Sequence, residues 1–124
     1  MDLKQYVLLV KKLAAKTSEG SASWEKTASD SVFQTAVSDY SIRLSKVFQP
    51  WGETEDAPDY FLALFNNQGQ LIESVSHAEL QQADPSFEAY SFMAELFRNA
   101  RRNAMGAENA VSEILKGLDG LLPF

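Results

Sequence analysis

Apolar and polar positions alternate with a period of two in the middle of the chain, over residues 59–76. Both faces of the extended segment 60–65 are apolar, so we expect an inner strand that is covered at least partly on each side. Residues 66–69 contain Asn and Gly, which tight hairpin turns favour. Residues 71–75 then return as a more polar strand, which we place nearer an edge of the sheet.

Shorter segments with strand character precede this hairpin. Residues 23–27 and 32–37 are candidates, and residues 40–45 alternate cleanly, with Tyr40, Ile42 and Leu44 on the side expected to face the core. Short turns, including one at residues 38–39, separate the segments. The pattern therefore predicts an antiparallel β-meander of four or five strands, over about residues 23–76.

Helical periodicity marks the first part of the chain and the region after the hairpin. Residues 2–15 carry a broad apolar stripe, and Asp2 is suited to cap the start of the helix. Ser76 with Glu79 matches a capping box, which predicts a short helical turn. The strongest helical pattern follows Asp84 and Pro85, a capping residue and a residue that fits the first helical turn.

A last helix is predicted over residues 107–118, after a break at Gly106. We expect it to bury its apolar side chains, Val111, Ile114, Leu115 and Leu118. The fold class is therefore α+β, a meander packed against an N-terminal helix and two C-terminal helices, as a single domain over residues 1–124.

Composition and charge narrow the possible functions. Apolar residues make up 45% of the 124, which suits a packed core, and the net charge of −6 argues against wholesale binding to nucleic acid or to an anionic membrane. There is no cysteine, so thiolate chemistry is excluded. No apolar run approaches the length of a membrane span, and we expect a cytoplasmic protein with no cofactor.

Two charged clusters are candidates for a binding surface. The loop at residues 49–58 is dense in carboxylates, but their spacing does not fit a calcium-binding EF-hand, so we interpret it as a solvated loop and predict no metal site. A second cluster lies at the end of the second-last helix, where cations suit the helix dipole. The candidate surface residues are Arg98, Arg101, Arg102, Glu53, Glu55 and Asp56.

The one histidine, His77, follows the capping Ser76. No serine or second histidine stands near it as a catalytic partner in the pattern that nucleophilic catalysis uses, and we interpret it as a turn or surface residue. We predict no catalytic residue in this chain.

Several short motifs together resemble a loose group of small uncharacterised prokaryotic proteins. They are Trp24-Glu25-Lys26-Thr27, Phe33, Tyr40-Ser41-Ile42, Asp59-Tyr60, Asn67-Gln68-Gly69, Leu96-Phe97 and Ala100-Arg101-Arg102. The group has a Trp-Glu-Lys-Thr strand, a Tyr-x-Ile strand and a Leu-Tyr-x-x-Ala-Arg-Arg helix, in which Phe97 replaces the tyrosine here. The resemblance spans residues 13–118 and implies this order of elements and a prokaryotic origin, without any known activity or site.

Three classes of function remain. We favour a non-enzymatic protein-binding module, an adaptor or immunity-type protein that acts through its surface. The alternative is a small-ligand-binding protein or enzyme with a polar pocket between sheet and helices, formed by the loop carboxylates with Arg43 or Arg101. Nucleic-acid binding through Arg98, Arg101 and Arg102 is the third class. We favour instead the interpretation that these arginines are charges at a helix end, either paired with a carboxylate or solvated.

The C-terminal tail raises the question of self-association. Leu118, Leu121, Leu122 and Phe124 place four large apolar side chains in the last seven residues. Such a tail either folds back within the chain, which we favour, or docks on a second copy to form a homodimer.

Overall fold

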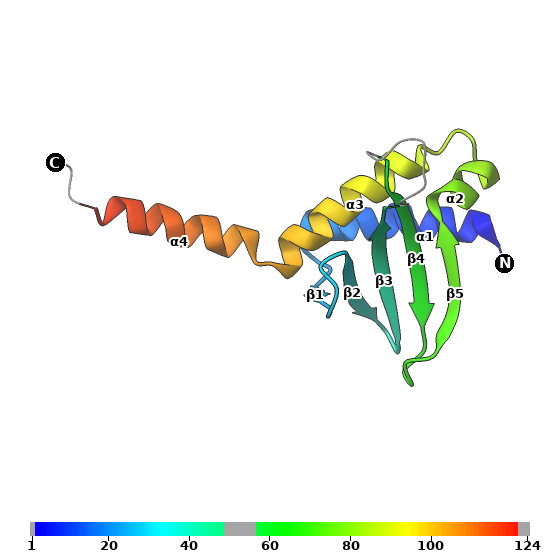
Figure 1. Cartoon of the computed structure of the whole chain (residues 1–124), viewed down its shortest axis with the longest axis horizontal. Helices are drawn as coiled ribbons and strands as arrows, with labels where there is room; N and C mark the ends of the chain where they lie inside the picture. The colour runs from blue at the N-terminus through cyan, green and yellow to red at the C-terminus, as the bar shows by residue number, and fades with distance from the viewer. Residues whose placement is uncertain (1, 49–56, 122–124) are drawn as a thin grey trace.

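The computed structural model describes residues 2–48 and 57–121 and has the predicted α+β architecture (Figure 1). The elements run in the order α1 (Leu3–Glu19), β1 (Trp24–Lys26), β2 (Val32–Val37), β3 (Tyr40–Val47), β4 (Asp59–Phe65), β5 (Leu71–Ser76), α2 (His77–Ala83), α3 (Ala89–Ala104) and α4 (Ala107–Asp119). One N-terminal helix, the sheet and the C-terminal helices follow one another as the sequence pattern predicts.

The sheet is a five-stranded meander in the order β1-β2-β3-β4-β5, with every neighbouring pair antiparallel. The predicted edge position of β5 is confirmed. Leu44 lies opposite Leu62, and Leu62 lies opposite Val75, so one face of the sheet carries a continuous row of apolar side chains. This row forms the centre of the core, because all three side chains are fully buried.

The two faces of β4 are covered in different ways. Tyr60 and Leu62 lie on the inner face, in the same core cluster as residues from α1, α2 and α3. On the outer face Phe61 and Phe65 are half-buried, and the guanidinium of Arg43 lies 4.4 Å from the centre of the Phe65 ring. Partial cover on both sides is therefore confirmed, and on the outer face a cation–π contact supplies part of it.

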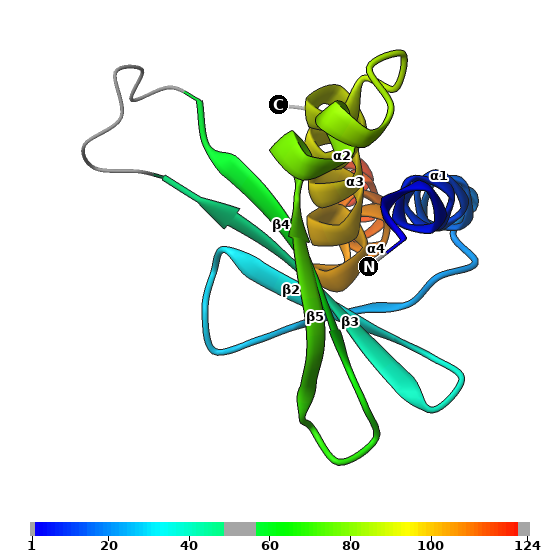
Figure 2. The ribbon, with the colours of Figure 1, turned by 90° about the vertical axis from the view of Figure 1, so that its right-hand side faces the viewer.

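The β2–β3 hairpin extends past the helices at its tip (Figure 2). Val37 lies opposite Tyr40, and Ser38 has a positive φ of 58°, as a tight hairpin turn requires. Tyr40 exposes 52% of its surface. The prediction that Tyr40 belongs to the core is wrong. Its side chain is on the core-facing side of β3, as predicted, but no helix reaches the end of the hairpin to cover it.

Helix α1 begins as predicted and ends later. The Asp2 side chain accepts hydrogen bonds from the backbone N–H groups of Lys4 and Gln5. The helix continues to Glu19, past the predicted end at residue 15, and Gly20 closes it in the left-handed conformation with φ 84°. The extra turn places the buried Thr17 hydroxyl where the indole N–H of Trp24 donates to it at 2.9 Å.

The capping box that opens α2 is confirmed, since the Ser76 hydroxyl accepts from the Glu79 backbone and the Glu79 side chain accepts from Ser76. The predicted start of the next helix at Asp84 is wrong. Asp84 instead closes a turn, where its Oδ1 accepts hydrogen bonds from the backbone N–H and the hydroxyl of Ser86. The hydroxyl hydrogen bond is the main reason that the pKa of Asp84 is lowered. Because an aspartate side chain caps turns as readily as helices, the presence of Asp84 in the sequence did not show which of the two it forms.

Helix α4 does not pack against the sheet. Gly106 has φ 70° and turns the chain outward, and α4 extends away from the other elements, meeting only α3 (Figure 1). None of its residues is buried, and Ile114 exposes 60% of its surface. The prediction that Val111, Ile114, Leu115 and Leu118 are buried is therefore wrong within this chain.

Candidate interaction surface

One side of α4 carries a row of exposed large apolar residues, which we call the α4 stripe. Their spacing of three and four places them on one side of the helix. Soluble monomers rarely expose a continuous apolar patch of this kind. The α4 stripe consists of Val111, Ile114, Leu115 and Leu118 within the helix and Leu121 just after its end, each more than half exposed.

Carboxylates border the α4 stripe on one side. At 3.6 residues per turn, Glu108 and Asp119 fall on one flank of the stripe, whereas the other flank carries Ala110 and Gly117. Lys116 falls on the side of the helix opposite the stripe. Glu108 lies 3.5 Å from Arg102, a contact that joins the start of α4 to the end of α3. A surface that covers the α4 stripe would therefore meet negative charge at one edge.

A second apolar surface lies between α1 and the ends of β2 and β3, and we call it the α1–β2 groove. It has a volume of about 430 Å³, within the usual range for binding clefts. Lys12 and Lys16 stand among the polar residues that line it. Its apolar lining consists of Leu9, Leu13, Ala22, Ala36, Val37 and Ile42.

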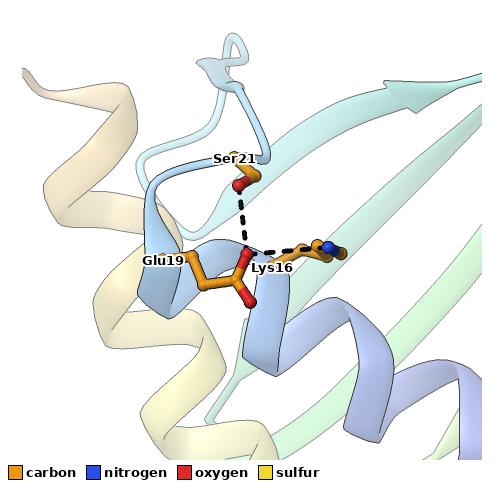
Figure 3. Close-up of polar contacts among 3 residues, drawn as sticks. All are labelled: Lys16, Glu19 and Ser21. Atoms are coloured by element: carbon orange, nitrogen blue, oxygen red, sulfur yellow. Dashed lines mark hydrogen bonds and ion pairs between the residues drawn. The ribbon is translucent and has the colours of Figure 1, made fainter.

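The two lysines of the α1–β2 groove have different surroundings. Lys16 pairs with Glu19 at 3.6 Å, and the Ser21 hydroxyl donates to the same carboxylate oxygen at 3.1 Å (Figure 3). Lys12 is exposed and has no ion-pair partner in residues 2–48 or 57–121. The apolar Leu9 and Leu13, which widen the stripe of α1, were the signal that this side of the helix has a further role.

The predicted arginine cluster is dispersed over the end of α3. Arg98 pairs with Glu95 at 3.7 Å, and Arg102 with Glu108. Arg101 is exposed and lines a separate small hollow with Lys26 and Met105. The acidic candidates Glu53, Glu55 and Asp56 lie outside the described residues, so the two halves of the predicted charged surface are not brought together.

His77 has a structural role. Its Nδ1 accepts the backbone N–H of Tyr60 at 3.1 Å, and its ring meets the Tyr90 ring edge-on at 5.2 Å. Burial, and then the neighbouring Tyr90, raise the pKa of Tyr60. The imidazole thus joins the start of α2 to β4 and α3, in keeping with the prediction of a turn residue.

A polar hollow of about 280 Å³ lies between the ends of α1 and α3. Most of its polar side chains are occupied with one another or with the backbone. Glu19 bonds Lys16 and Ser21, Arg102 bonds Glu108, and the Asn103 side-chain oxygen accepts the backbone N–H of Trp24 at 2.7 Å. The hollow therefore offers few free groups to a ligand. Within residues 2–48 and 57–121, no group of three or more His, Asp or Glu side chains could hold a metal ion.

Comparison with family models, with curated proteins and with solved structures gives no match to this chain. The resemblance to a group of small prokaryotic proteins stays a prediction. Within the described part of the chain, no helix is both long and apolar enough to cross a membrane. The surface geometry therefore carries the functional argument.

Proposed function

We propose that this protein is a small non-enzymatic protein-binding module and that α4 is its binding element. The α4 stripe supports this proposal, because it is the exposed apolar side of an amphipathic helix, and among the described elements that helix meets only α3. Amphipathic helices commonly bind by laying such a side into an apolar groove of a partner, through residues spaced three and four apart. The cytoplasmic location and prokaryotic origin expected from the sequence remain predictions.

The position of α4 suits this role. It leaves α3 at Gly106 and touches no strand, so a partner can reach the α4 stripe without opening the core. Burying a leucine or isoleucine side chain contributes about 1.5–3 kcal/mol. The five residues of the α4 stripe can therefore supply much of the free energy of a specific complex, after the cost of association.

Site-specific photo-crosslinking in the native host tests the proposal. A photoreactive residue at position 114, within the α4 stripe, should give a discrete protein adduct. The same residue at Lys116, on the opposite side of the helix, is the control and should give none. Equal labelling at both positions, or no adduct from position 114, would contradict the proposal.

A further inference from the structure

We propose that the partner of the α4 stripe is a second copy of this chain, and that it binds through the α1–β2 groove. The inference rests on the proposed function, because it assigns the surface that α4 would bind. In this arrangement α4 of each copy lies in the groove of the other. The two contacts are equivalent and related by twofold symmetry.

Charge is the first argument for this pairing. The α4 stripe is bordered by Glu108 and Asp119 on one flank. The surface that covers it should therefore be an apolar groove with cations along one rim. The α1–β2 groove has this composition, with Lys12 and Lys16 beside Leu9, Leu13 and Val37.

The same charges disfavour the simpler dimer in which two α4 helices pair in antiparallel orientation. That arrangement would place Glu108 and Asp119 of one copy beside the same residues of the other. Lys116 lies on the far side of each helix and cannot neutralise them. Like charges placed together at an interface disfavour the pairing.

Area is the second argument. Covering the α4 stripe removes roughly 500 Å² of apolar surface from water. Two such contacts would remove about 1,000 Å² from the two stripes alone, which reaches the lower limit for a specific interface before the groove surface is added. A single contact would remove about half of that. Reciprocal exchange therefore explains how a short helix can hold a dimer together.

Light scattering combined with a mixing experiment tests the pairing. The unmodified chain should have twice the 13.8 kDa mass of one copy. Leu118→Asp in the α4 stripe and Val37→Glu in the α1–β2 groove should each give a monomer. Both positions are exposed within the single chain, so the fold should persist, and circular dichroism checks this. An equimolar mixture of the two variants should form a heterodimer that is weaker than the unmodified dimer, because one intact stripe meets one intact groove and the second contact is lost.

Charge reversal gives a matched second test. Lys12→Glu and Asp119→Lys should each raise the dimer dissociation constant about two- to fivefold per ion pair lost. Combining the two changes in one chain should return the constant toward that of the unmodified protein. Raised salt should weaken the unmodified dimer.

Three results would overturn the inference. A Val37→Glu variant that still dimerises while Leu118→Asp does not would indicate pairing between α4 helices. A monomer whose α4 becomes protected from hydrogen exchange would indicate that the helix folds back on its own chain. A monomer whose position 114 crosslinks a different protein would contradict self-pairing but leave the proposed function intact, whereas a monomer without any adduct would contradict both.

Discussion

At the scale of single residues, polar side chains join the layers of the fold at defined points. The Tyr6 hydroxyl donates a hydrogen bond to the Glu73 carboxylate, which connects α1 to the edge strand β5. Thr17 and Asn103 accept the side-chain and backbone N–H groups of Trp24, which fixes β1 between α1 and α3. In the described residues no buried side-chain polar atom lacks a hydrogen-bond partner. Buried polar groups of this kind are costly unless paired, so each contact helps to specify one arrangement of the layers.

The Tyr6–Glu73 contact predicts a loss of stability at alkaline pH. Burial, followed by the hydrogen bond and the charge of Glu73, raises the pKa of Tyr6 from 10.0 to about 12. Because the folded-state pKa is raised, the contribution of Tyr6 is fully present below pH 10 and is lost as the pH rises toward 12. Urea midpoints measured at pH 9 and pH 11 should therefore fall less in Tyr6→Phe than in the unmodified protein.

Tyr40→Phe is the matched control for this measurement, since Tyr40 is half-exposed at the hairpin tip. It should show the same alkaline fall as the unmodified protein. If Tyr6→Phe also falls to the same extent, the hydroxyl of Tyr6 is not coupled to folding as proposed.

At the scale of elements, local sequence signals predicted most of the strands and two helix starts. Period-two alternation identified β3 and β4, and the caps at Asp2 and Ser76 are local hydrogen-bonding motifs that sequence spacing reveals directly. The wrong helix start at Asp84 came from a local ambiguity between a turn and a helix cap, and the errors in burial came from tertiary structure. Tyr40 alternates with the core residues of β3 and lies on the same side of the strand. It is exposed because the helices do not extend over that end of the hairpin, which the sequence pattern does not show.

The candidate surface was harder to predict for the same reason. The α4 stripe has the spacing of any core-facing helix, and sequence alone cannot tell whether such a stripe packs within its own chain. The α1–β2 groove combines residues from α1 with residues of β2 and β3, so it exists only once the elements are placed together. Among the predicted candidates, Arg98 and Arg102 lie near the end of α3 and form ion pairs with glutamates. This agrees with the interpretation of these arginines as paired or solvated charges at a helix end.

The two faces of the sheet should respond differently to substitution, because the helices bury residues of the inner face and leave the outer face more exposed. Leu62 is fully buried on the inner face, and Leu62→Ala should lower the free energy of unfolding by about 2–5 kcal/mol. Ser74 on β5 lies opposite Ala63 on the outer face and is exposed, so Ser74→Ala should change it by no more than about 0.5 kcal/mol. Chemical denaturation measures both, and similar values for the two variants would show that the faces are assigned wrongly.

At the scale of the whole molecule, the chain divides into a packed body and a projecting helix. The body comprises the sheet with α1, α2 and α3, and the core cluster draws its buried residues from these elements. Helix α4 supplies none of them and meets the body only at the end of α3. The net charge of −6 keeps isolated copies apart at long range, so association requires the local match between lysines and carboxylates.

This division predicts how the protein responds to loss of α4. Removing residues 107–124 should leave the free energy of unfolding unchanged, within about 0.5 kcal/mol, at concentrations where the intact chain is monomeric, because none of the residues of α4 is buried. At higher concentration the intact chain should gain stability by mass action while the truncated chain does not, since only the former can associate. Thermal unfolding over a range of protein concentrations measures both effects. A truncated chain that is less stable at every concentration would mean that α4 packs on its own body in solution, and the outward position of the helix would then not describe the monomer.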